Sequence, residues 1–236
     1  MRESVVWLRD PLEVTYSPER LELLAWLRRR AEELGSALGP GWFVHGSLAR
    51  GDVHRRSDID LVYLERGTVP SFSVELGLER AGIEWLSREI VVATPNSAPK
   101  GRILIDSRAS VTFPLVPFKP NEEGFYRFGG ALPAKGLATA PRVPGVSKRL
   151  LLVIPTAKGH IESSVVGREA EVARFLNVPF EVVSERVRVL TRRSDVGRTG
   201  VYLREEVPDE ISFEEFLKRL ADRDPVIRRT VTERGT

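Results

Sequence analysis

The chain has 236 residues, of which 42% are hydrophobic and 29% charged, and its formal net charge is +3. This composition is typical of a globular protein with one large domain or two small ones. There is no cysteine, which excludes disulfides, thiolate metal sites and cysteine nucleophiles, so a metal would have to bind to oxygen or imidazole.

Neither a membrane anchor nor a secretion signal is indicated. No run of about 18 uncharged apolar residues is present, and Met1 to Asp10 lacks a basic segment followed by an apolar one. We therefore take the cytoplasm as the default location. The three histidines are few and widely spaced, so a carboxylate site for Mg²⁺ is favoured over a zinc site. Arginines gather in short runs, and we expect those at 28–30 and 228–229 to be solvated helix faces.

The first predicted element is a helix over Pro18 to Leu38, with Ser17 as its cap, Pro18 in its first turn and apolar residues at helical spacing. Two short strands follow, over Trp42 to His45 and Asp58 to Leu64. Between them a turn opens into a short helical segment just after Ser47. The order is strand, turn, helix, strand.

Later segments predict a sheet with hairpins and then a second domain. Residues 74–85 have a helical pattern, whereas 89–93, 102–106 and 111–116 are β-rich. Residues 117–147 hold many prolines and glycines and are predicted to be a linker or long loop. We therefore expect a first domain over residues 1–116 and a second over 148–236.

The chemistry gathers in residues 43–61. Asp58 and Asp60 are two apart on the second strand, so both carboxylates should project from one face while Ile59 and Leu61 turn into the core. Two neighbouring carboxylates favour a bound cation such as Mg²⁺, with Mn²⁺ as the alternative. Gly46 and Ser47 end one strand and open a helix, which allows backbone N–H groups and the Ser47 hydroxyl to approach a triphosphate.

Arg50 lies about one helical turn after Ser47 and has two equally weighted interpretations. It contacts a phosphate of the bound nucleotide, or it pairs with Asp52 or another nearby carboxylate.

The pattern Gly46-Ser47, ten residues, then Asp58-Ile59-Asp60 resembles the nucleotidyltransferases of the DNA polymerase β superfamily, and its local version is most similar to the minimal nucleotidyltransferases of archaea and bacteria. The resemblance implies an α/β (α+β) polymerase β-type fold with a mixed sheet. It also implies that Asp58 and Asp60 bind Mg²⁺ and that Gly46 and Ser47 bind a nucleoside triphosphate.

The resemblance further implies a third acidic residue on a later strand, which binds the catalytic metal and takes a proton from the nucleophile. We choose Asp106, which ends the β-rich run 102–106, as this catalytic and metal-binding residue. Glu89 is the alternative. An alignment to residues 111–114 would instead put Thr112 where the acid belongs and would imply an impaired enzyme.

The C-terminal part resembles a small winged helix-turn-helix domain, with two helices around Asn177 to Pro179 and a glycine-flanked hairpin at 197–203. On the second helix, Val183, Val187 and Leu190 would face the core. Its outward residues could contact nucleic acid, and Arg198 and Thr199 would form the tip of the wing. Glu181 and Glu185 on the same helix oppose that role, and a purely structural module is equally compatible. The candidate nucleic-acid contacts are Ser184, Arg188, Arg192 and Arg198.

These observations predict a metal-dependent enzyme that transfers a nucleoside monophosphate from a nucleoside triphosphate to a hydroxyl acceptor and releases pyrophosphate. The alternative is a catalytically weak or inactive nucleotidyltransferase-fold protein that acts as a nucleic-acid-binding or regulatory factor through its winged helix. The acceptor and the base of the nucleotide do not follow from the sequence.

Overall fold

A computed structural model describes residues 4–65, 67–197 and 200–235. Helix α1 (Pro18–Leu38) has the predicted bounds. The Ser17 hydroxyl accepts a hydrogen bond from the Arg20 N–H at 3.4 Å, and the helix ends at Gly39, whose φ is 84°. Its buried residues, which include Leu24, Leu27, Ala31 and Leu34, recur every three or four positions and form one apolar face.

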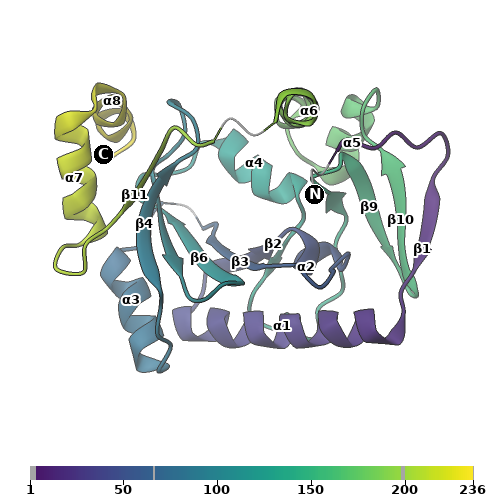
Figure 1. Cartoon of the computed structure of the whole chain (residues 1–236), viewed down its shortest axis with the longest axis horizontal. Coiled ribbons are helices and arrows are strands. Elements are labelled where there is room, and N and C mark those ends of the chain that lie inside the picture. Colours follow the sequence, from purple (N-terminus) through teal and green to yellow (C-terminus); the bar gives the residue numbers. More distant parts are fainter. Residues whose placement is uncertain (1–3, 66, 198–199, 236) are drawn as a thin grey trace.

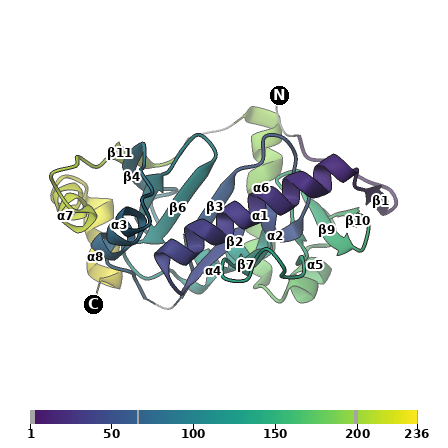
Figure 2. The same cartoon turned by 90° about the horizontal axis from the view of Figure 1, so that it is seen from below.

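A seven-stranded mixed sheet lies against that face. Its strand order is β11 (Leu203–Glu206), β4 (Ser87–Val92), β5 (Lys100–Leu104), β6 (Ala109–Pro114), β3 (Ile59–Tyr63), β2 (Trp42–His45) and β7 (Ala131–Pro133). Strands β3 and β6 are parallel, and the other neighbours are antiparallel. Helix α1 crosses below the sheet, and α4 (Pro120–Phe128) and α6 (Phe180–Val196) lie above it (Figure 1; Figure 2 shows the α1 side). The expected mixed sheet is confirmed.

A smaller unit has its own core. Its four-stranded sheet has the order β1 (Leu12–Thr15), β10 (Gly159–Ser164), β9 (Leu151–Thr156) and β8 (Gly145–Val146). Helices α5 (Glu169–Leu176) and α6 complete this unit, and buried side chains of both helices pack with those of β8 and β9. The predicted inward positions on α6 agree with the structure, because Val183 and Leu190 are buried and Val187 packs against the same core.

The segment 117–147 differs from the predicted linker. It contains α4, the edge strand β7 of the large sheet and the edge strand β8 of the small one. Pro120 stands in the first turn of α4, and the Glu122 carboxylate accepts a hydrogen bond from the Lys119 N–H at 2.8 Å in a capping box. The proline therefore starts a helix instead of marking a flexible connection. Helix α3 (Ser71–Arg80) also begins earlier and ends earlier than the pattern over 74–85 suggested.

The end of the chain returns to the large unit. Strand β11 pairs with β4, and α7 (Phe213–Arg223) and α8 (Pro225–Arg234) place Phe213 and Ile227 in the core of the seven-stranded sheet. A boundary near residue 148 therefore does not separate the two cores. Helices α5 and α6 stand on either side of Asn177 to Pro179 as predicted, and β11, at the end of the predicted wing segment, pairs with β4 of the large sheet. Arg198 and Thr199 lie outside the described residues. In the described ranges, no helix is long and apolar enough to cross a membrane.

Candidate functional site

Asp58 directly precedes β3, one residue before the strand begins, and Asp60 is the second residue of β3. Ile59 and Leu61 are fully buried in the core that contains α1, so the alternation of a strand turns both carboxylates to the opposite face. We call this the carboxylate face. Burial raises the pKa of Asp58, and the like charge of Asp60 raises it further, although Lys148, Arg108 and His54 partly offset the rise. The predicted carboxylate pair is therefore formed.

The turn before α2 (Ser47–Arg50) brings a serine beside this pair. Gly46 has a φ of 82° and open space where a Cβ would stand, so glycine is needed here for its backbone conformation. The Ser47 hydroxyl donates to the Ser57 hydroxyl oxygen at 3.3 Å, and that oxygen also accepts the His54 N–H at 2.9 Å. These bonds tie the loop to α2 and hold Ser47 close to Asp58.

Arg50 adopts the second of its two predicted roles. Its side chain is 7% exposed, and Nη2 lies 3.0 Å from a carboxylate oxygen of Asp52. Its Nη1 donates to the carbonyl oxygens of Gly129 and, at 3.3 Å, of Val146. These contacts favour a structural role over the assignment of Arg50 to nucleotide binding, because the buried guanidinium joins α2 to the segments around Gly129 and β8.

Arg28 also has a structural role, which contradicts the expected solvated helix face. It is 5% exposed and donates to the carbonyl oxygens of Leu48 at 3.1 Å and Ala49 at 3.2 Å. Further bonds reach the carbonyls of Leu137 and Ala140. Helix α1 thus holds the short helix α2 through one buried arginine, which satisfies carbonyls that α2 cannot satisfy itself.

The choice of Asp106 as the third acid is not supported. One carboxylate oxygen of Asp106 accepts the N–H groups of Arg108 at 2.6 Å and Ala109 at 3.0 Å, which closes the β5–β6 turn. The other forms an ion pair with Arg30 of α1, the helix on the side of the sheet opposite Asp58 and Asp60. Asp106 is a turn-closing residue that faces the wrong side of the sheet.

Glu89 does not reach the site either. It stands on β4, which two strands separate from β3, and its carboxylate lies 4.0 Å from Arg102 and 3.8 Å from Arg204. Within the described part of the chain, no group of three or more acidic, histidine or cysteine side chains could hold a metal ion.

Ser110 occupies the position opposite Asp60 on the parallel strand β6. Its hydroxyl donates to an Asp60 carboxylate oxygen at 2.9 Å. Thr112, the residue named by the third alignment, stands opposite Val62, one step further along the same face. Alternation in the sequence identified the strand but could not reveal which of its residues would lie opposite Asp60.

His45 and Lys148 belong to the site although the sequence did not single them out for it. The register that pairs Val44 with Leu61 puts His45 opposite Asp60 on β2. Burial lowers the pKa of His45 to about 4, and its Nδ1 is buried without a hydrogen-bond partner among the described residues. Lys148 is exposed in the turn after β8, and its charge acts on both His45 and Asp58. Lys148 is about 90 residues or more from Asp58 and His45 in the sequence, so no local sequence pattern could assign it to the site.

The outer face of α6 has the predicted character. Ser184, Arg188 and Arg192 are exposed, as are Glu181 and Glu185. This face of α6 therefore presents basic, acidic and small polar groups together.

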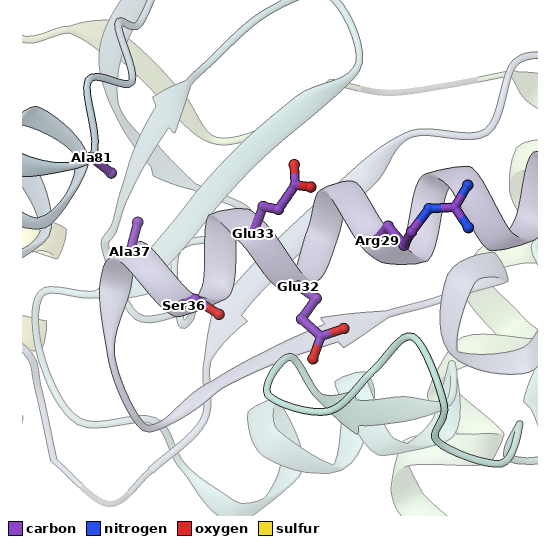
Figure 3. Close-up of a pocket in the computed structure, with 6 residues that line it drawn as sticks. All are labelled: Arg29, Glu32, Glu33, Ser36, Ala37 and Ala81. Atoms are coloured by element: carbon purple, nitrogen blue, oxygen red, sulfur yellow. The ribbon is translucent and has the colours of Figure 1, made fainter.

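A hollow of about 650 Å³ lies elsewhere, along α1 (Figure 3). It is lined by Arg29, Glu32, Glu33, Ser36, Ala37 and Ala81. The Glu32 carboxylate already accepts the N–H groups of Gly136 at 2.9 Å and Ala138 at 3.0 Å. No residue of the Gly46 to Asp60 segment lines this hollow, so it is not the candidate site.

Residues 24–112 match the family model of a nucleotidyltransferase domain. The match runs from α1 to β6 and includes Gly46, Ser47, Asp58 and Asp60. A search of curated proteins and a search of solved structures gave no match.

Proposed function

We propose, from the nucleotidyltransferase domain in residues 24–112, that this protein transfers a nucleoside monophosphate from a nucleoside triphosphate to a hydroxyl acceptor. The observation that carries the proposal is the meeting of the Gly46–Ser47 turn with Asp58 and Asp60 on one face, linked by the bond between Ser47 and Ser57. In the reaction, the acceptor oxygen bonds to the α-phosphorus, the bond to pyrophosphate breaks, and the acceptor proton leaves to solvent.

The donor set fits a nucleotide-bound Mg²⁺, or Mn²⁺ in its place. Magnesium is usually bound by one or two carboxylates together with substrate phosphates, and Asp58 and Asp60 supply two. A bound cation would relieve the repulsion that contributes to the raised pKa of Asp58 and would neutralise charge on the phosphates. Ser47 and Lys148 are the candidate phosphate contacts from the chain.

Strand β6 supports two further possibilities: a slower transfer reaction, and, as the second candidate function, a regulatory protein without transfer activity. Ser110 stands where a third carboxylate could bind a second metal and accept the proton of the nucleophile. A serine hydroxyl at neutral pH does neither well. This favours slow turnover, or a nucleotide-binding regulatory protein that contacts nucleic acid through the outer face of α6 and its residues Ser184, Arg188 and Arg192.

The test is Mg²⁺-dependent transfer from an α-labelled nucleoside triphosphate by Asp58→Asn and Asp60→Asn variants. Each variant should lose at least about 100-fold in rate and remain folded, because the change removes charge from a repelling pair. Glu65→Gln, which alters an exposed acid just after β3, is the control and should react at the normal rate. Full activity in either aspartate variant would refute the assignment.

The second candidate makes a different prediction. A protein that acts through α6 should bind duplex DNA or RNA at low salt, with affinity that falls steeply as salt rises. Arg188→Gln and Arg192→Gln should weaken that binding and leave nucleotide affinity unchanged. Measurable transfer without any nucleic-acid binding would exclude it.

A further inference from the structure

Arg142, in the segment before β8, binds the turn between β9 and β10 of the small sheet. Its Nη1 donates to the carbonyl oxygen of Gly159 at 2.9 Å, and its Nη2 donates to the carbonyl oxygen of Thr156. The guanidinium carbon lies 5.3 Å from the centroid of the Tyr16 ring, and Tyr16 directly precedes the cap of α1. The small sheet and the start of α1 therefore fix the position of this guanidinium.

The aliphatic part of the same side chain covers the end of α2. The Arg142 Cδ fills the space where a Cβ on Gly51 would stand, and Nη1 lies 3.1 Å from that position. Gly51 caps α2 with a φ of 93°, a conformation that favours glycine. The next residue, Val143, donates its N–H to the carbonyl oxygen of Ala49 at 3.1 Å. The segment 142–143 therefore contacts the last turn of α2 while Arg142 holds the small sheet.

Gly51 is one hydrogen bond away from the serine of the candidate site. Its N–H donates to the carbonyl oxygen of Ser47 at 2.7 Å. The Ser47 hydroxyl in turn donates to Ser57, which directly precedes Asp58. Helix α2 has only four residues, so it has few hydrogen bonds of its own and its position depends on the contacts around it. A shift of Gly51 would therefore move the Ser47 end of the helix.

We infer that Arg142 is a positioning residue that ties Gly51, and through it the Gly46–Ser47 turn, to the β9–β10 turn, so that nucleotide affinity depends on the small sheet. Its guanidinium holds the small sheet, and the aliphatic part of its side chain holds Gly51. This inference rests on the proposed function, because it takes Ser47 as a contact of the bound triphosphate.

The test is titration of a nonhydrolysable nucleoside triphosphate with Mg²⁺ into wild-type protein and two variants. Arg142→Met keeps an unbranched side chain over Gly51 but loses both hydrogen bonds to the small sheet, and should weaken binding at least about fivefold. Arg142→Lys keeps a donor and should lose less. In Arg142→Met the Gly51 amide proton should also exchange with solvent at least about tenfold faster, because α2 is held less firmly.

Val165→Ala is the matched control for a general loss of stability. Val165 is fully buried in the core of the small unit, so its truncation should lower the free energy of unfolding. It should leave both nucleotide affinity and Gly51 exchange unchanged. Denaturant unfolding gives the stability of each variant for this comparison.

The outcomes separate this inference from the proposed function. Unchanged nucleotide affinity in Arg142→Met overturns the inference, as does an equal loss of affinity in Val165→Ala. If the analogue does not bind wild-type protein in a Mg²⁺-dependent way, the proposed function fails and Gly51 exchange alone decides the inference. Faster exchange in Arg142→Met would then support the link to the small sheet, and unchanged exchange would overturn it.

Discussion

Strands β2 and β6, which flank Asp60 on β3, place different side chains next to it. On the β2 side, the half-buried His45 packs against Phe125 and Tyr126 and is followed by the turn that Arg50 anchors. On the β6 side, the residue opposite Asp60 is Ser110, whose hydroxyl donates to an Asp60 carboxylate oxygen at 2.9 Å. Under the proposed function, the closely packed β2 side would support nucleotide binding, whereas Ser110 on the β6 side is not the acid that fast transfer would need. The proposal therefore makes separate predictions for nucleotide binding and for turnover.

The largest effect should come from removing Arg50, the anchor of the β2 side. Arg50→Gln leaves Asp52 and two carbonyls without their buried partner and should lower the free energy of unfolding by about 3–5 kcal/mol. Denaturant unfolding measures this loss, with the exposed Arg56→Gln as control. A loss below about 1 kcal/mol would show that the turn does not depend on Arg50.

His45 should make the stability of the β2 side depend on pH. Its pKa in the folded protein, about 4, lies below the ordinary value of 6.5, so the unfolded chain takes up the proton first as pH falls. The free energy of unfolding should therefore decrease between about pH 6.5 and pH 4, by up to about 3 kcal/mol. His45→Phe should remove this part of the pH dependence. Parallel pH profiles for the two proteins would contradict the prediction.

The β6 side can be tested by giving it the missing acid. Ser110→Asp places a carboxylate opposite Asp60 and should raise the Mg²⁺-dependent transfer rate at least about tenfold, since proton acceptors typically contribute about 100-fold or more. Thr112→Asp, on the same face but opposite Val62, is the matched control and should give a smaller change. An unchanged rate in Ser110→Asp, with nucleotide binding intact, would show that this position is not where the acid acts.

Lys148 should have the smallest effect. Lys148→Gln removes an exposed charge near Asp58 and should weaken binding of the Mg²⁺-nucleotide complex about threefold to tenfold, with no change in stability. Lys158→Gln, in the exposed β9–β10 turn, serves as control. Equal affinities in the two variants would remove Lys148 from the site.

Local sequence patterns predicted those parts of the site whose structure depends on residues close together in the chain. The capped helix α1, the Gly46–Ser47 turn and the alternation around Asp58 and Asp60 each depend on residues within one or two turns of chain, and each is present as expected. The pairing of β3 with β6 joins residues about 50 positions apart, so the sequence could not show that Ser110, and not Asp106, stands opposite Asp60.

Packing over long distances explains the other differences. The sequence predicts that Arg28 is a solvated residue on a helix. In the structure it donates hydrogen bonds to carbonyl oxygens of α2 and of residues 137–140, which are close to α1 only in the folded chain. The pairing of β11 with β4 was likewise not predicted, because it joins strands more than 100 residues apart. Neither partner is visible in the local pattern.

The central claim is that Asp58 and Asp60 hold a metal-bound nucleotide, and binding of a nonhydrolysable nucleoside triphosphate to wild-type protein and Asp60→Asn tests it most directly. Wild-type protein should bind the analogue at least about tenfold more tightly with Mg²⁺ than with a chelator, and Asp60→Asn should lose that difference. Equal affinity with and without Mg²⁺ in the wild-type protein, or an unchanged Mg²⁺ effect in Asp60→Asn, would contradict the claim.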